Sequence, residues 1–463
     1  MLRRLKFCST PYAATAVLLL LLGSAARAQW VEDSVDVGSA WVGSMAYNAA
    51  AGVVYGCSNS GDFVFAISCA TNEVISRVDA FYPKDMAYDS IDGKLYCTFG
   101  LDPESVLVVS GTTHQRIKAI PLSWAGTTVW DPVNDYLYVT CSEANEVAVI
   151  DCRTDSVIMS IRTGQGPARK YLNTLHHKLY VQNWDSESVT IVDLDTHEVI
   201  RTIPLDGVPL AGYYCPAVDK YYHGAATVVT SICGVGDTVV RNISLPFGYG
   251  VEALTAAESG PLVYAAGYNG SRGRVFTVDP VRDSVLDTLE VGRHPDALAW
   301  SQRSGLVYCA NIAANNVSVL ADDGTGVLKT LQAASDPFVF CLVPRHDRVY
   351  LGHLGSRMVY VIKDRAGGIE ERDGNGGLAS RALRVRPSPF RSRVQVDCSG
   401  PGFDTPDVSV FSGDGRLVRR VPMTSQGLAS WDGCDSGGKE VPAGVYVFVA
   451  DGRGARAVAV KAD

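Results

Sequence analysis

The sequence predicts an all-β protein in which a ring of repeated four-stranded sheets, a β-propeller of eight blades, is followed by a small β-sandwich. Two observations predict the ring. A tyrosine at the end of a short apolar strand recurs about every 42 residues, and each repeat holds four short strands bounded by turn residues. This period is typical of a propeller blade rather than of a helical solenoid. The third observation, a change of pattern after residue 364, predicts the separate sandwich; seven blades is the alternative count for the ring.

The repeated tyrosines set the register of the blades. They are Tyr55, Tyr96, Tyr138, Tyr180, Tyr222, Tyr264, Tyr308 and Tyr350. About 13 residues after each, a second apolar strand ends in a small or acidic residue before a polar turn. At Asp151, Asp193 and Asp279 we expect the carboxylate to accept backbone N–H groups of that turn, a structural role and not a catalytic one. A fourth, alternating strand and a Gly/Pro corner such as 164–167 complete each repeat.

The eighth repeat lacks its outermost strand, because the chain runs from Val359–Ile362 into a Gly-rich stretch. A matching segment exists near the N-terminus. Residues Val31–Val37 resemble the outer strand Ser284–Val291 and precede the same Gly corner. We therefore predict that residues 30–37 complete the last blade, which would leave the ring without a long free sheet edge.

Residues 1–28 have the features of an export signal. Arg3, Arg4 and Lys6 are followed by an apolar stretch over 13–22 and by the small-x-small site 26–28. The apolar stretch is shorter than a bilayer span, so cleavage before Gln29 would leave no transmembrane segment. We expect a secreted or cell-surface protein, with the periplasm as a further possibility.

Charge and motifs restrict the function. The chain carries 41 Lys and Arg against 49 Asp and Glu and has no basic stripe, which disfavours nucleic acid as a partner. The short signatures of serine hydrolases, zinc peptidases and phosphate-binding loops are absent, so the sequence predicts no catalytic residue, no cofactor and no metal site. The histidines, which fall at different positions within their repeats, predict no symmetric metal ring. They are His114, His176, His177, His197, His223, His294, His346 and His353.

Eleven of the 12 cysteines follow the export signal, so at least one thiol per monomer is unpaired unless two chains are joined. Most of those in the ring are expected to be small buried apolar residues. In residues 383–463 there are two, Cys398 and Cys434. An oxidising compartment and a small domain favour a disulfide between them, with two free thiols as the alternative.

Propeller sites usually lie where the corners between blades meet the central channel. The corner residues are Val42, Pro83, Ala125, Pro167, Pro209, Gly250, Pro295 and Pro337. The charged residues beside them that we predict to bind a ligand at the channel mouth are Lys84, Asp85, Arg169, Glu252, His294 and Asp296, and Lys170 lies close by. The alternative is a solvated rim without a ligand.

Residues 29–364 resemble the YVTN-type propeller repeat. The resemblance rests on units such as 295–300, 305–311 and 134–140, and it covers about residues 36–364. It implies the propeller fold and says little about function, because similar rings include surface and binding proteins as well as lactonases and quinone-dependent dehydrogenases. Residues 213–246 depart most from the pattern.

Residues 365–382 are rich in Gly and charge and predict a flexible linker. The Gly-rich hairpins of 383–463 predict the small sandwich. Its segments Pro387–Phe390, Trp431–Gly433 and Val441–Tyr446 resemble an immunoglobulin-like domain of the FlgD-like type, found at the C-termini of exported bacterial proteins. Similar domains are sorting signals for type IX secretion, with a passive terminal sandwich as the alternative here.

Together these features predict an exported, extracytoplasmic bacterial propeller that binds a partner without catalysis, with a C-terminal domain for sorting or surface attachment. The ligand would be a protein, a glycan or a small molecule, and the C-terminal domain would engage the export machinery. The alternative is an enzyme with its site in the channel, such as a lactonase-like hydrolase or a quinone-dependent dehydrogenase.

Overall fold

The computed structural model describes residues 29–100, 104–257, 262–364, 384–386, 393–397, 407–412, 417–424, 428–450 and 455–461. The chain divides into two compact units, 1–369 and 370–463. Their boundary falls within the predicted linker 365–382. The predicted signal 1–28 lies outside the described residues. No helix of the described part is long and apolar enough to cross a membrane.

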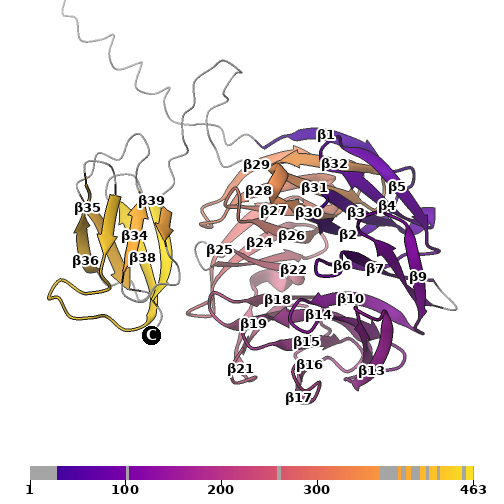
Figure 1. Cartoon of the computed structure of the whole chain (residues 1–463), viewed down its shortest axis with the longest axis horizontal. Helices are drawn as coiled ribbons and strands as arrows, with labels where there is room; N and C mark the ends of the chain where they lie inside the picture. Colours follow the sequence, from indigo (N-terminus) through magenta and orange to yellow (C-terminus); the bar gives the residue numbers. More distant parts are fainter. Residues whose placement is uncertain are drawn as a thin grey trace, which may run out of the picture. The chain divides into compact units, whose positions relative to one another are not determined.

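The first unit is an eight-bladed β-propeller of four-stranded antiparallel sheets (Figure 1). Blade 1 is β2 (Val42–Asn48), β3 (Val53–Ser58), β4 (Phe63–Ser68) and β5 (Glu73–Asp79); blade 2 is β6 (Asp85–Asp89), β7 (Lys94–Phe99), β8 (Ser105–Ser110) and β9 (Arg116–Pro121); blade 3 is β10 (Ala125–Asp131), β11 (Tyr136–Cys141), β12 (Glu146–Asp151) and β13 (Ser156–Arg162); blade 4 is β14 (Pro167–Asn173), β15 (Lys178–Asn183), β16 (Ser188–Asp193) and β17 (Val199–Pro204). Blade 5 is β18 (Ala211–Cys215), β19 (Lys220–Gly224), β20 (Val228–Cys233) and β21 (Val239–Ser244); blade 6 is β22 (Gly250–Ala257), β23 (Leu262–Tyr268), β24 (Gly273–Asp279) and β25 (Ser284–Val291); blade 7 is β26 (Pro295–Ser301), β27 (Leu306–Asn311), β28 (Asn316–Ala321) and β29 (Val327–Gln332); blade 8 is β30 (Pro337–Val343), β31 (Arg348–His353), β32 (Met358–Lys363) and the N-terminal β1 (Val31–Asp36).

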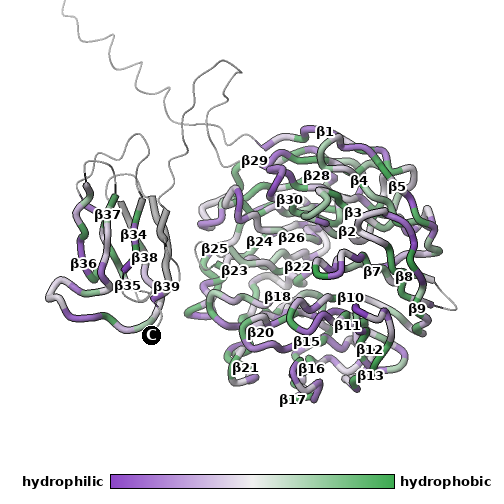
Figure 2. The backbone as a smooth tube through the Cα atoms, viewed as in Figure 1, coloured by the Kyte–Doolittle hydropathy of each residue, from purple (hydrophilic) through white to green (hydrophobic). Residues whose placement is uncertain are grey.

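Short 3-10 turns are the helical elements of the described residues. They are η1 (Asn59–Gly61), η2 (Pro246–Gly248), η3 (Ile312–Ala314) and η4 (Pro344–His346). Apolar stretches recur in every blade and are interrupted by hydrophilic turns (Figure 2). The first strand of each blade contacts the first strand of the next, and β30 contacts β2, so the ring is closed.

The ring is closed by the N-terminal strand. β1 pairs antiparallel with β32, with Val35 opposite Val359, and in Figure 1 the indigo β1 runs beside the orange end of the propeller. Val35 and Val37 are buried in a core shared with blades 8 and 1. The predicted completion of the last blade by residues 30–37 is therefore confirmed, as is the count of eight blades.

The repeated tyrosines join neighbouring blades. The hydroxyl of Tyr96 donates to Asp155 Oδ1 (2.6 Å) in the next blade, and that of Tyr308 donates to Asp364 Oδ1 (2.8 Å). Tyr350 of the last blade reaches Asn72 of the first (2.7 Å). A buried tyrosine needs a partner for its hydroxyl, and the turn before the outermost strand supplies one. Seven of the eight tyrosine hydroxyls contact the next blade in this way, whereas that of Tyr180 accepts from Asn173 Nδ2 of its own blade (3.3 Å). The register recurs in the sequence because most blades repeat this contact.

Two histidines occupy this same turn position, which corrects one expectation. His114 and His197 both have positive φ (58° and 60°) and contact the hydroxyls of Tyr55 (2.6 Å) and Tyr138 (3.1 Å). They are therefore equivalent, contrary to the expectation that every histidine falls at a different position. The loop between β7 and β8 is one residue longer than its counterpart between β15 and β16, and this insertion hides the equivalence in a simple residue count.

The predicted turn roles of the strand-ending aspartates are confirmed. Asp151 Oδ1 accepts the N–H of Arg153 (2.9 Å), and Asp193 and Asp279 accept backbone N–H groups of their own turns. The ring cysteines are also as expected, since all of those described are buried except Cys233, which is half-buried.

The second unit contains two antiparallel sheets. One is β33 (Arg384–Arg386), β34 (Val394–Asp397) and β37 (Leu428–Trp431); the other is β36 (Leu417–Pro422), β35 (Asp407–Ser412), β38 (Gly444–Ala450) and β39 (Ala455–Lys461). Buried residues of both sheets form one core around Trp431, as in a small sandwich. Cys398 lies outside the described residues, so its disulfide with Cys434 stays a prediction.

Candidate functional site

The inner strands of six blades carry a β-bulge near their start, and each of these six strands starts at a predicted corner residue. In β22 the register shifts between Val251 and Ala253, and in β26 between Pro295 and Ala297. The extra residues at these two bulges are Glu252 and Asp296. A bulge leaves one residue out of the ladder and re-aims its side chain. The fold therefore presents two carboxylates at neighbouring positions of the channel mouth.

These carboxylates meet a histidine. Donor atoms of Glu252, His294 and Asp296 all lie within 4.8 Å of one another, with His294 Nε2 3.8 Å from Asp296 Oδ1. The ring of His294 stacks on Tyr268, with centroids 4.7 Å apart. Among the described residues, neither carboxylate accepts a hydrogen bond. This group is thus acidic, partly buried and poorly satisfied by its own chain.

The titration of the two carboxylates reflects this environment. Burial raises the pKa of Glu252, and the charge of Asp296 raises it further. Burial also raises the pKa of Asp296, against smaller lowering effects of His294 and Arg169. Arg169 lies on β14 of blade 4, and its charge lowers the pKa of both carboxylates. The structure therefore brings three of the six predicted site residues within 4.8 Å of one another, and the charge of a fourth, Arg169, acts on them.

The other two predicted residues, Lys84 and Asp85, are engaged in contacts between blades. Lys84 pairs with Glu104 and donates to the carbonyl of Ala125 (3.2 Å). Asp85 accepts the hydroxyl of Ser44 (2.8 Å) from blade 1 and the N–H of Thr128 (2.7 Å) from blade 3. With their polar atoms occupied in this way, they hold the inner strands together.

Lys170, the next residue after Arg169, points into the protein. It is 8% exposed, and its ammonium donates to Thr127 Oγ1 at 2.7 Å. No carboxylate of the described residues forms an ion pair with it. Burial lowers the pKa of Lys170 to about 7, with a smaller opposing effect of Asp85. Lys170 is therefore a buried structural residue next to the channel mouth, and its pKa is well below that of a free lysine.

The structure also shows aromatic residues that the sequence reasoning missed. Trp41, Tyr82 and Trp124 each directly precede a corner residue and have positive φ (64°, 52° and 62°). Trp41 and Trp124 are about half exposed (49% and 51%). Large side chains rarely adopt this backbone conformation, and such strain concentrates at functional sites. The sequence feature that could have identified these three aromatic residues is their position, one residue before each of the first three corner residues.

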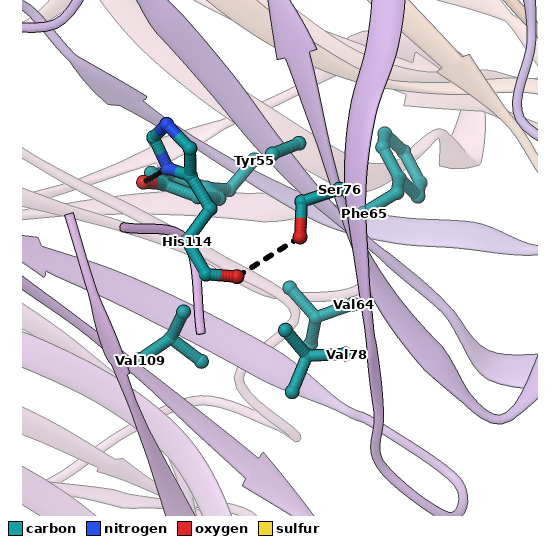
Figure 3. A pocket seen from close by; sticks show the side chains of 8 residues that line it. Tyr55, Val64, Phe65, Ser76, Val78, Val109 and His114 are labelled. Atoms are coloured by element: carbon teal, nitrogen blue, oxygen red, sulfur yellow. Dashed lines mark hydrogen bonds between the residues drawn. The ribbon is translucent and has the colours of Figure 1, made fainter. Parts of the chain in front are cut away.

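A crevice between blades 1 and 2 is a poor candidate for a site. It is lined mainly by apolar side chains, with Ser76 and His114 as its polar edge (Figure 3). Ser76 Oγ donates to the carbonyl of His114 (2.9 Å), and the His114 ring contacts Tyr55. These polar groups are satisfied by the protein itself, so the crevice offers a ligand little to bind.

No protein-family model matches this chain, and no curated protein is found to be similar to it. The fold alone defines its class: an eight-bladed β-propeller with a further small β-sandwich unit. The candidate site is the group Arg169, Glu252, His294 and Asp296 at the channel mouth, which we call the mouth cluster. The aromatic residues Trp41, Tyr82 and Trp124 we call the aromatic corners.

Proposed function

We propose that the protein is an exported bacterial propeller that binds a ligand at the channel mouth without catalysis. The observation that carries this proposal is the pair Glu252 and Asp296, two bulge-mounted, partly buried carboxylates that accept no hydrogen bond within the described chain. Because the described chain supplies no hydrogen-bond donor to these partly exposed carboxylates, they are free to accept hydrogen bonds from a ligand.

The chemistry of the pair favours a ligand with a cationic group, such as the side chain of a lysine or an arginine of a partner protein. Charge-assisted hydrogen bonds to carboxylates are stronger than neutral ones, and a concave mouth screens them less than an open surface does. The aromatic corners supply apolar contact area on other blades, of the kind that anchors protein ligands.

Export and attachment are supported by the sequence. Residues 1–28 have the features of a signal peptide, and the order of segments in 383–463 resembles the C-terminal domains that sort exported proteins. We therefore propose that the ring faces an extracytoplasmic partner, on the cell surface, in the periplasm or after secretion, and that the C-terminal unit directs sorting or attachment.

Binding of a fluorescent oligolysine peptide to the full mature chain tests the ligand class. The isosteric double variant Glu252→Gln with Asp296→Asn should weaken binding at least 10-fold, because both variants lose charge while keeping their shape. Asp151→Asn is the matched control and should bind as wild type does, because Asp151 contacts the backbone and the Arg153 side chain of its own turn. An Nε-acetylated peptide should bind neither protein.

Equal affinity of wild type and the double variant would refute the proposed site. Trp41→Ala separately tests the aromatic corners: a loss of affinity for a peptide that combines lysine with apolar residues, without a loss for oligolysine alone, is the expected result.

A metal-dependent hydrolase is the second candidate, because the donor atoms of Glu252, His294 and Asp296 are close enough to share a metal ion. Hydrolysis of a lactone probe that depends on added Zn²⁺ or Ca²⁺ and disappears in His294→Ala would favour the enzyme over the binding protein.

A further inference from the structure

The inner strand of blade 2 ends in a carboxylate whose second oxygen has no partner. Asp89 Oδ1 accepts the N–H groups of Ile91 (2.7 Å) and Asp92 (3.0 Å), which forms the turn after β6. Asp89 Oδ2 is buried without a hydrogen bond within the described chain, and the residue as a whole is fully buried. This is a costly arrangement for an ionised group.

Other blades satisfy the equivalent atom. In blades 1 and 4 the equivalent residue is an asparagine, Asn48 or Asn173, and its Oδ1 accepts the backbone N–H groups of the same turn. The amide nitrogen of each asparagine donates a further hydrogen bond: Asn48 Nδ2 to the carbonyl of Gly111 (3.0 Å), and Asn173 Nδ2 to a tyrosine hydroxyl (3.3 Å). In blade 3 the residue is Asp131, and its Oδ2 contacts His177 Nε2 (2.9 Å). At this position of blades 1, 3 and 4, the second polar atom of the side chain has a hydrogen-bond partner, whereas Asp89 Oδ2 has none within the described chain.

Two further ligand-type side chains of blade 3 lie close to Asp89. Asp135 follows β10 and is 7% exposed; its Oδ1 accepts the indole N–H of Trp130 (3.1 Å), while its Oδ2 is also buried without a partner. Cys152 follows β12 and is fully buried. Donor atoms of Asp89, Asp135 and Cys152 lie within 4.8 Å of one another.

The nearby lysine does not neutralise this group. Lys94 Nζ donates to the carbonyl of Cys152 (2.6 Å) and to Asp155 Oδ1 (3.1 Å), and it lies 3.4 Å from Asp92 Oδ2. Its charge is thus shared by two other carboxylates. Asp89 and Asp135 are both buried, and one carboxylate oxygen of each has no hydrogen bond within the described chain. The pair needs either a shared proton or a bound cation.

We propose that Asp89, Asp135 and Cys152 bind one thiophilic divalent cation of the Zn²⁺ class between blades 2 and 3. Carboxylate oxygen and thiolate sulfur are both zinc ligands, whereas Ca²⁺ and Mg²⁺ take oxygen ligands only. The cation fills the place that the asparagine amide fills in blades 1 and 4, and it ionises the Cys152 thiol on binding. Since all three ligands are buried, the ion enters as the protein folds and cross-links the two blades.

Co²⁺ is the probe that tests this site, because a Co²⁺–thiolate bond gives a charge-transfer band in the near ultraviolet. The mature chain is unfolded with chelator, refolded with one equivalent of Co²⁺ or Zn²⁺, and desalted. Wild type should retain about one metal ion per chain and show the band. Cys152→Ser should lose the band, and Asp89→Asn should lower the affinity for Zn²⁺ at least 10-fold while folding normally, because its amide replaces the ion.

Cys69→Ser is the matched control, because Cys69 is buried and follows β4 as Cys152 follows β12, while the inner strand of the preceding blade ends in Val343 instead of an aspartate. It should retain both the band and the metal. The proposal is overturned if refolded wild type binds no stoichiometric metal, or if Cys152→Ser keeps the cobalt band. It is also overturned if Asp89→Asn is more stable than wild type by the same margin in Zn²⁺ and in chelator, since that result identifies a shared proton and not a cation.

Discussion

Replacing Lys170 by methionine should make the propeller more stable at pH 6 and change how its stability depends on pH. The side chain is 8% exposed, its one hydrogen bond goes to the neutral Thr127, and no ion pair compensates its charge within the described residues. Burial therefore lowers its pKa from 10.5 to about 7. Methionine has a similar volume and no charge to desolvate.

The magnitude follows from linkage. Between about pH 7 and pH 10.5 the unfolded chain holds a proton on this lysine that the folded chain has lost, so the free energy of unfolding rises with pH across this window. Each pKa unit corresponds to about 1.4 kcal/mol, so the whole shift amounts to roughly 5 kcal/mol. From pH 7 to pH 9, wild type should gain roughly 2–3 kcal/mol relative to Lys170→Met. Below pH 7 the lysine is charged in both states and its cost is fully present.

The assay is guanidinium unfolding of wild type and variant at pH 6, 7, 8 and 9, followed by tryptophan fluorescence. The difference between the two curves isolates Lys170, because the other titrating groups are common to both proteins. Lys178→Met is the matched control: Lys178 is equally buried (9% exposed) but paired with Asp237 at 2.7 Å, so its loss should destabilise the protein at every pH. Parallel profiles for wild type and Lys170→Met would refute the reasoning.

Three further predictions concern the fold. Tyr308→Phe removes the buried hydrogen bond to Asp364 (2.8 Å) and should lower the free energy of unfolding by about 1–3 kcal/mol, measured by chemical denaturation; an unchanged stability would show that the tyrosine contact between blades is not stabilising. Val35→Asp places a charge in the buried seam between β1 and β32 and should expose the ring ends to limited proteolysis, whereas the exposed Ser34→Asp should not; equal resistance would contradict closure by this strand. Trp431→Ala leaves a cavity in the core of the second unit and should lower its free energy of unfolding by about 3–5 kcal/mol, measured by denaturation of an isolated 383–463 fragment. An unchanged unfolding midpoint would argue against a core shared by the two sheets.

The sequence by itself determined the architecture of the ring. Tyr55 and its seven counterparts marked eight blades, and the match of Val31–Val37 to an outer strand identified how the ring closes. Turn roles such as that of Asp193 were equally visible. These features could be predicted because they depend on contacts within one blade or on a contact repeated in most blades, so the same residue types recur at a nearly fixed spacing.

Only the tertiary structure decided which charged residues meet. Lys84 and Arg169 have similar places in their repeats, yet Lys84 pairs with Glu104, while the charge of Arg169 lowers the pKa of Glu252 on another blade. The burial of Lys170 was likewise invisible in the sequence. Such partners are set by bulges, by the loops of adjacent blades and by the convergence of inner strands on one axis. These side chains are far apart in the sequence and meet at one place in the ring, not in every repeat. Their pairing therefore cannot be predicted from the spacing of the residues.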